Sequence, residues 1–184
     1  MLRDELRFDE EAHRYFFRDK ELRGVTSLIS KRLRKKYSEG SMKLMEARDY
    51  GKLFHREVED FLMFGREPID PGVRWVDEII KLYPRNEWAV RCEMLISNYK
   101  CTASAIDIVL YKPRGNGVNS AVIFDIKTGE FCREYCSWQL GFYKWFLEIE
   151  GDFVVEDAYV IAKKDARLYK VTPIPKERCE SLLS

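Results

Sequence analysis

The strongest constraint on the fold of this 184-residue chain is a change in the spacing of its apolar residues near position 88. Upstream, residues 41–64 carry apolar side chains three, four, seven and eight positions apart, which is the spacing of one helix face. Downstream, apolar residues alternate with others over 88–96, and strand-like segments follow at 102–111 and 120–127. Helical spacing returns at 133–149. Helices, three strands and another helix in this order predict a mixed α/β fold.

Shorter elements complete the prediction. Trp88, Val90, Cys92, Met94 and Ile96 are expected to share one face of the first strand of this group. Further predicted elements are a strand pair within 5–29 around His13, Tyr15 and Phe17, a short helix capped by Thr26 or Ser27, a helix opened by Pro71 and ending near Pro84, a hairpin turn at 114–117, strands at 156–163 and 167–172, and a helix from Pro175.

Composition and charge narrow the class of protein. With 46% hydrophobic residues the chain can bury a core, so a disordered chain is excluded. Its 32 Lys and Arg against 31 Asp and Glu give a net charge of +1, which excludes a generally basic nucleic-acid binder. A nucleic-acid enzyme stays open, because a local basic patch suffices for it. Such a patch is predicted at the run that holds Lys31, Arg32, Arg34, Lys35 and Lys36.

The same composition indicates the organisation of the chain. We expect a single domain over 1–184, whose N-terminal strand pair and basic segment, about 1–40, form an appendage. No apolar run approaches the roughly 18 residues of a membrane helix, and no signal peptide is recognisable. Five cysteines, an odd number without paired short spacings, indicate a reducing environment, so an intracellular, cytoplasmic protein is expected.

Polar groups stand out at several places in this pattern. In the first long helix, His55 and Glu59 are four residues apart and share a face, and Gly51 lies one turn before His55. A glycine inside a helix costs about 1 kcal/mol relative to alanine, which indicates that another group approaches closely there. In the second strand, Asp107 lies among apolar neighbours, where an unpaired carboxylate is costly. Alone, each feature also fits a surface ion pair or a satisfied structural aspartate.

Further polar groups follow on the third strand and the next helix. Asp125 and Lys127 are two residues apart and project from one strand face. Glu93 adds a carboxylate to the preceding strand, and Gln139 and Tyr143 share a helix face. Strand carboxylates with a histidine suit a hard divalent cation such as Mg²⁺ or Mn²⁺. A lysine beside them can orient a water and offset the charge that builds on a phosphate during hydrolysis.

At these residues the chain resembles the PD-(D/E)XK nuclease superfamily, and within it the RecB-like and phage (lambda-type) exonuclease branch with mitochondrial genome maintenance exonuclease-like proteins. The family pattern is Gly-x-x-x-His-x-x-x-Glu, a strand Asp, Asp/Glu-x-Lys before Thr, and Gln-x-x-x-Tyr. The resemblance spans about residues 13–147, includes His-x-Tyr at His13 and Tyr15, and departs from the family at Ser104, where glycine is common. The matching residues are Gly51, His55, Glu59, Asp107, Asp125, Lys127, Thr128, Gln139 and Tyr143.

The resemblance implies a restriction-endonuclease-like core, in which a central mixed β-sheet is flanked by helices. It also implies roles for individual residues. The implied catalytic residues are Lys127, Asp125, Asp107 and Glu59; the implied metal ligands are His55, Asp107, Asp125, Glu93 and the carbonyl of Ile126; the implied substrate-binding residues are Gln139, Tyr143 and Thr128, with Lys35, Lys36 and, as a second contact, Lys163 and Lys164 on the DNA backbone.

The implied function is Mg²⁺- or Mn²⁺-dependent hydrolysis of DNA, by an exonuclease acting at DNA ends in recombination, repair or replication. A structure-specific endonuclease, a non-catalytic DNA-binding module and a metal-dependent enzyme acting on nucleotides or RNA stay open as alternatives. The partner is DNA, with no membrane; a homo-oligomer and a recombination partner protein are both compatible with the family. Cys132 and Cys136 do not form a Cys-x-x-Cys pair, so an iron–sulfur cluster is not expected.

Overall fold

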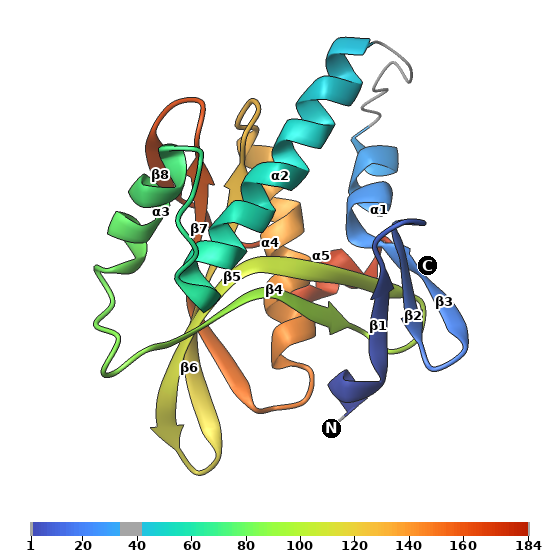
Figure 1. The fold of residues 1–184 in the computed structure, drawn as a ribbon. Helices are drawn as coiled ribbons and strands as arrows, with labels where there is room; N and C mark the ends of the chain where they lie inside the picture. The colour runs from blue at the N-terminus through green and yellow to red at the C-terminus, as the bar shows by residue number, and fades with distance from the viewer. Residues whose placement is uncertain (1, 34–41, 184) are drawn as a thin grey trace.

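A mixed β-sheet with helices on both faces runs through residues 2–33 and 42–183, the part of the chain that the computed structural model describes (Figure 1). This is the α/β class, with a central mixed sheet flanked by helices, that the sequence predicts. The helices are η1 (Leu2–Glu5, a 3-10 turn), α1 (Val25–Arg32), α2 (Met42–Phe64), α3 (Gly72–Ile80), α4 (Arg133–Glu148) and α5 (Lys176–Glu180). The strands are β1 (Leu6–Asp9), β2 (Arg14–Phe17), β3 (Lys20–Gly24), β4 (Ala89–Ser97), β5 (Thr102–Gly115), β6 (Val118–Lys127), β7 (Phe153–Ala162) and β8 (Arg167–Lys170).

Strand β5 is the centre of this sheet. Within the described residues the strands are hydrogen-bonded in the order β1-β2-β3-β5-β6-β7-β8, and β4 pairs with β5 beside this path. The β3–β5 and β6–β7 pairs are parallel, and the other pairs are antiparallel. Because β5 pairs with β4 and with β6, the three strands that carry the predicted carboxylates are neighbours.

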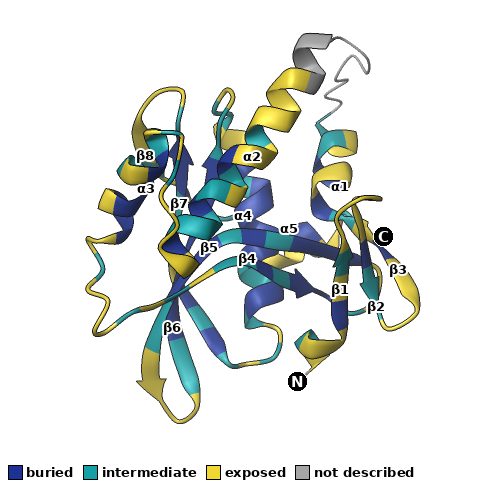
Figure 2. Ribbon diagram, in the orientation of Figure 1, coloured by how far each residue is buried: buried dark blue, intermediate teal, exposed yellow. Residues whose placement is uncertain are grey.

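The helices bury the two faces of the sheet in separate cores. In β6, Ala121 and Ile123 pack in the core under α4, whereas Val122, Phe124 and Ile126 pack in the core under α2 and α3. Figure 2 shows α4 and the middle of the sheet as buried. This strict alternation is what a strand covered on both faces requires, and each fully buried large apolar side chain stabilises the fold by about 1.5–3 kcal/mol.

The alternation fails at one point of the β4–β5 pair. Cys92 and Ile108 are paired and lie in the core under α2 and α3, but Met94 and Ile106, which pair two residues further along the strands, lie in the core under α4. Between them Glu93 has a left-handed backbone, with a φ of +47°. Such a residue interrupts the pleat. The side chains of both strands therefore change from one face of the sheet to the other at this point.

This exchange corrects one interpretation of the sequence. Trp88, Val90 and Cys92 contact the core under α2 and α3, whereas Met94 and Ile96 belong to the core under α4. The prediction that all five share one face is therefore wrong, because it assumed an uninterrupted pleat.

The N-terminal segment differs from the prediction in its strands and in its helix cap. It holds three strands rather than a pair, and β3 continues the sheet through the register Arg23 to Thr102. Helix α1 begins at Val25 directly after β3, with Gly24 as its N-cap and no side-chain capping bond. The predicted cap at Thr26 or Ser27 is wrong, because both residues already lie in the first turn of the helix.

Other predicted elements are confirmed with shifted ends. The 114–117 turn is present, and Asn116 and Gly117 have φ values of +52° and +76°. Leu53, assigned by spacing to the apolar face of α2, is instead 60% exposed. Of the basic run, Arg34, Lys35 and Lys36 lie outside the described residues. In the described part of the chain, no helix combines the length and apolar character that crossing a membrane requires.

Candidate metal centre

Three predicted metal ligands from three elements meet in space. His55 of α2, Glu93 of β4 and Asp107 of β5 each place a ligand atom within 4.8 Å of the others. His55 Nδ1 lies 3.5 Å from Asp107 Oδ1 and 3.6 Å from Glu93 Oε1. One imidazole nitrogen and two carboxylates are donor types that divalent cations bind, so these three residues form a candidate metal centre.

Gly51 brings α2 close enough to the sheet for this meeting. A Cβ atom at Gly51 would lie 3.3 Å from Thr128 Oγ1, just beyond the end of β6. Phe54 and Val58 bury the adjacent face of the same helix. His55, one turn after Gly51, is thereby held against the strands; the group that approaches this glycine is the Thr128 side chain.

The irregular point of the β4–β5 pair turns the two carboxylates toward α2. In a regular strand Asp107 would share the face of Val109, which packs under α4. The face exchange at Glu93 brings it to His55 instead. Asp107 Oδ2 also accepts a hydrogen bond of 2.5 Å from the backbone N–H of Ile126, which fixes the carboxylate against β6.

A second group lies beside this cluster on β6 and α4. Lys127 Nζ is 2.7 Å from Asp125 Oδ2 and donates a 2.9 Å hydrogen bond to Gln139 Oε1. Gln139 Nε2 in turn donates a 2.5 Å hydrogen bond to Tyr143 Oη. Asp125 is 1% exposed, and within the described residues its Oδ1 has no hydrogen-bond partner. The predicted shared faces of Asp125 with Lys127 and of Gln139 with Tyr143 are confirmed.

The structure thus divides the predicted ligand set. Asp125 is not one of the three groups that meet at His55. The backbone N–H of Ile126 holds Asp107, and a strand residue directs its carbonyl toward the same neighbour as its N–H. The carbonyl of Ile126 therefore faces β5, on the side of the cluster, and its role as a ligand stays a prediction.

Mutual charge shifts the titration of the cluster. Desolvation disfavours the imidazolium, but Asp107 and Glu93 outweigh it and raise the pKa of His55 to about 10. Desolvation also opposes ionisation of Asp107, yet His55 and Lys127 lower the pKa of this carboxyl. Burial, reinforced by Asp107, raises the pKa of Glu93. Without a metal, the protonated histidine is the cation that holds the carboxylates together.

The Asp125–Lys127 pair carries its own balance. Burial raises the pKa of Asp125 to about 6, although Lys127 opposes the shift. Desolvation disfavours the Lys127 ammonium, but Asp125 and Asp107 outweigh it and raise the pKa of Lys127. Lys127 is therefore a cation at neutral pH.

The remaining predicted residues lie around these two groups. Glu59 is half-buried one turn after His55, and burial followed by the charges of its acidic neighbours raises its pKa. Thr128 contacts α2 at Gly51. Lys35 and Lys36 lie outside the described residues, so their contact with DNA stays a prediction.

One buried residue near the cluster was not among the predicted site residues. Tyr15 of β2 is 9% exposed, and burial followed by the charge of Glu93 raises its pKa to about 12. The His-x-Tyr pattern marked this position in the sequence, but nothing local showed that β2 lies near β4.

Lys163, expected as a second DNA contact, already has partners. Its Nζ lies 3.0 Å from Asp70 Oδ2 and hydrogen-bonds to Tyr50 of α2. Lys164 is exposed, with its Nζ 3.6 Å from Glu130. Lys163 therefore ties the β7–β8 turn to α2, and a DNA contact would compete with its ion pair.

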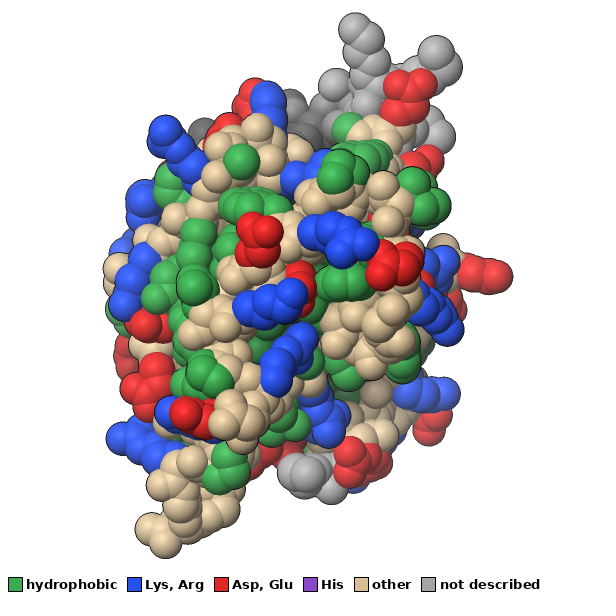
Figure 3. Space-filling view, turned by 60° about the vertical axis from the view of Figure 1, so that its left-hand side comes forward, with side chains coloured by type: hydrophobic (Ala, Val, Ile, Leu, Met, Phe, Trp, Pro, Cys, Tyr) green, Lys and Arg blue, Asp and Glu red, His purple; other side chains and the backbone are tan. Residues whose placement is uncertain are grey.

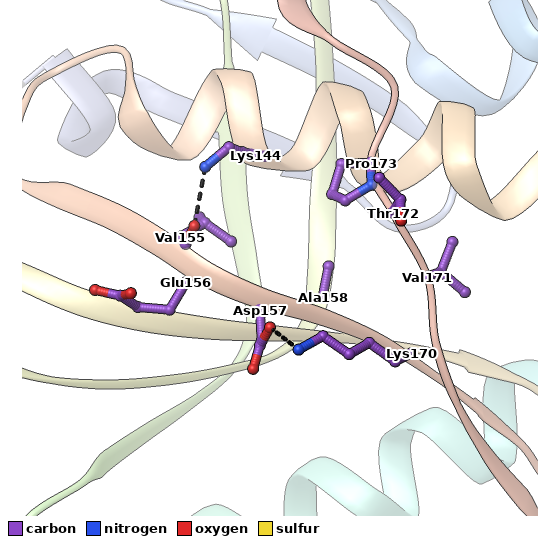
Figure 4. Close-up of a pocket in the computed structure, with 9 residues that line it drawn as sticks. All are labelled: Lys144, Val155, Glu156, Asp157, Ala158, Lys170, Val171, Thr172 and Pro173. Carbon is purple, nitrogen blue, oxygen red and sulfur yellow. Dashed lines mark hydrogen bonds and ion pairs between the residues drawn. The ribbon is translucent and has the colours of Figure 1, made fainter.

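A separate hollow of about 240 Å³ lies between β7, α4 and the segment before α5 (Figure 4). None of its lining residues belongs to the groups described above. Lys144 pairs with Glu148 at 2.6 Å, and Lys170 pairs with Asp157. With these charges already paired, the hollow is not the candidate metal centre.

Comparison with known proteins adds little to this geometry. No protein-family model and no curated protein matches the chain. A solved structure described as "Crystal structure of SSO0001" is similar at a TM-score of 0.47 and 14% identity, over 90% of this chain and 74% of that chain. Fold and site together define an α/β protein with a candidate metal centre at His55, Glu93 and Asp107.

Proposed function

We propose that this protein is a metal-dependent nuclease that hydrolyses phosphodiester bonds of DNA. The observation that supports this proposal most is the hydrogen bond that connects the His55 cluster with the Asp125–Lys127 pair. Asp107, a member of the cluster, accepts a hydrogen bond from the N–H of Ile126, the residue between Asp125 and Lys127. A donor set for a cation therefore adjoins a half-buried lysine, and both can stabilise the charge that develops when a phosphate ester is hydrolysed.

The residues present fit a hard divalent cation. His55, Glu93 and Asp107 would hold Mg²⁺ or Mn²⁺, since they offer one nitrogen and carboxylate oxygens close together. The free Oδ1 of Asp125 is a further oxygen donor at the border of the cluster. When bound, the cation would neutralise phosphate charge and lower the pKa of a water molecule.

Lys127 supplies the positive charge that belongs to the chain itself. As an ammonium, Lys127 can donate hydrogen bonds but has no lone pair with which to accept a proton, so in this state it is not a general base. It can hold the oxygen of the attacking water and favour its ionised form, and it can offset charge on the phosphate. Gln139, itself bonded to Tyr143, limits the positions that the ammonium reaches.

Within this function we propose an exonuclease that acts at DNA ends in recombination, repair or replication. This narrower proposal rests on the family resemblance of the motifs. A structure-specific endonuclease is the alternative within the same chemistry, and a DNA-binding module without activity is the alternative of another class.

The test is digestion of end-labelled single-stranded, double-stranded and circular DNA with Mg²⁺, Mn²⁺ or EDTA. We expect cleavage of linear DNA with either metal and none in EDTA. Cleavage of circles would replace the exonuclease with an endonuclease. Full activity in saturating EDTA would contradict the metal mechanism, and DNA binding without cleavage under every condition would favour the inactive module.

A further inference from the structure

Two exposed cations stand on α2 beside the cluster. Arg48 and Lys52 are four residues apart, so they lie on one side of the helix, and both are exposed. Neither makes an ion pair with any described residue. Arg56, one turn later, is different, because it pairs with Glu10 at 3.2 Å.

The helix geometry directs these cations toward the metal centre. Arg48 precedes His55 by seven residues, nearly two full turns, so the two side chains project in similar directions. With a rise of 1.5 Å per residue, Lys52 lies about 4.5 Å and Arg48 about 10 Å from His55 along the helix axis. Arg48 and Lys52 therefore place two positive charges along α2, next to the cluster of His55, Glu93 and Asp107.

The β1–β2 turn supports an unneutralised positive field here. His13 in this turn has a left-handed backbone, with a φ of +52°, and its ring contacts Phe8 at a centroid distance of 5.2 Å. Partial desolvation and then the charges of Arg48 and Lys52 lower the pKa of His13. The two cations therefore act on a neighbouring element across the side of α2.

Many of the other basic side chains in the described part of the chain already have an acidic partner. On the face drawn in Figure 3, Lys and Arg side chains lie among Asp and Glu side chains. Several of the described basic residues are in ion pairs, among them Arg66, Arg74, Lys81, Lys163 and Lys164.

We propose that Arg48 and Lys52 bind backbone phosphates of the DNA strand next to the phosphate that is cut. This inference rests on the proposed nuclease function and assigns part of its substrate surface. A cluster of carboxylates repels DNA until its cation is bound, so cations one and two turns away hold the strand in place. Contacts of this kind position DNA without reading its sequence.

The experiment measures binding of a fluorescent DNA oligonucleotide by anisotropy over a range of salt concentrations, with Mg²⁺ present and in the Lys127→Ala background, so that the cluster can hold its cation while cleavage is slowed. In Arg48→Gln/Lys52→Gln, loss of two phosphate contacts makes the plot of the logarithm of the association constant against the logarithm of the salt concentration less steep, by about 1.4–1.8. At 0.1 M salt this corresponds to about 25- to 60-fold weaker binding. The matched control is Lys20→Gln/Lys100→Gln, which removes two exposed charges, one at the start of β3 and one in the β4–β5 turn, and keeps wild-type affinity.

NMR titration of His13 gives a second readout that is independent of activity. The chain has two histidines, so the His13 signal is isolated in the His55→Gln variant. We expect the pKa of His13 to rise when DNA is added, because phosphate charge replaces the field of the two cations. An unchanged pKa in saturating DNA would contradict the contact.

The outcomes separate the two proposals. If the wild type cleaves DNA while the double variant binds with the affinity and salt slope of the control, the phosphate contact is wrong and the nuclease stands. If the wild type neither binds nor cleaves DNA, both proposals fall.

Discussion

The two groups of the candidate site solve the same electrostatic problem in different ways. In the first group, the two carboxylates of Glu93 and Asp107 lie 3.6 and 3.5 Å from the His55 imidazole, and Lys127 adds a second positive charge near Asp107. In the second group, the buried Asp125 and the partly exposed Lys127 form an ion pair at 2.7 Å, and Gln139 accepts a hydrogen bond from the lysine. We propose that a metal cation replaces the proton of His55 in the first group, whereas the second group has the Lys127 ammonium as its own cation. In this proposal, metal binding depends on His55, Glu93 and Asp107, whereas Lys127 acts on the substrate and is not needed to hold the metal.

Lys127→Ala tests this separation most strongly. We expect hydrolysis to fall about 10²–10³-fold, the usual loss for one preorganised group that stabilises developing charge. Mn²⁺ binding, measured by calorimetry, stays within a few-fold of the wild type because Lys127 is not in the His55 cluster. The control is Lys81→Ala, which removes an exposed lysine of an α3 pair. Wild-type cleavage by Lys127→Ala would make the assignment of the lysine wrong.

Asp107→Asn is the counterpart in the other group. It removes a charge that contacts His55 while keeping the shape of the side chain. Loss of a residue that only hydrogen-bonds to a metal ligand lowers metal affinity by about 10- to 100-fold. Because Asp107 is proposed as a ligand itself, we expect a larger loss of Mn²⁺ affinity, and hydrolysis should fall with it. Calorimetry measures the first effect. Unchanged metal affinity would place the metal elsewhere.

The pH dependence of metal binding sharpens the role of His55. With a pKa raised to about 10, His55 must release a proton to bind a metal, so affinity for Mg²⁺ rises about tenfold per pH unit below that value. Calorimetry in buffers of different protonation enthalpy counts this proton between about pH 6.5 and 8.5. In the metal-free protein the same shift stabilises the fold fully below about pH 6.5, and this contribution is lost as pH rises through about 10. Binding without proton release would exclude His55 as a ligand.

The smallest expected effect concerns the fit between α2 and β6. In Gly51→Ala, the new Cβ meets Thr128 Oγ1 at 3.3 Å, so α2 shifts by a few tenths of an ångström while its helix propensity improves by about 1 kcal/mol. We expect a few-fold loss of hydrolysis without loss of thermal stability. Gly51→Ala/Thr128→Ala, which makes room for the methyl group, should recover the rate. A loss that persists in the double variant would argue against the fit as the cause.

Sequence reasoning was reliable wherever one element carried the whole signal. The spacing of Asp125 and Lys127 predicted a shared strand face, and their ion pair confirms it. The spacing of Gln139 and Tyr143 predicted a shared helix face, and their hydrogen bond confirms it. It failed at Glu93, because its glutamate side chain gave no signal of a left-handed backbone and the rest of the strand alternates normally.

The sequence by itself determined the types of the elements and the pairs of residues within each of them, because helix and strand periods are local properties of the chain. Only the tertiary structure decided which groups meet. His55 and Asp107 are 52 positions apart in the chain and lie 3.5 Å apart in space. The physical reasons are the contact that Gly51 permits with Thr128 and the face exchange at Glu93, which together turn three side chains from three elements toward one point.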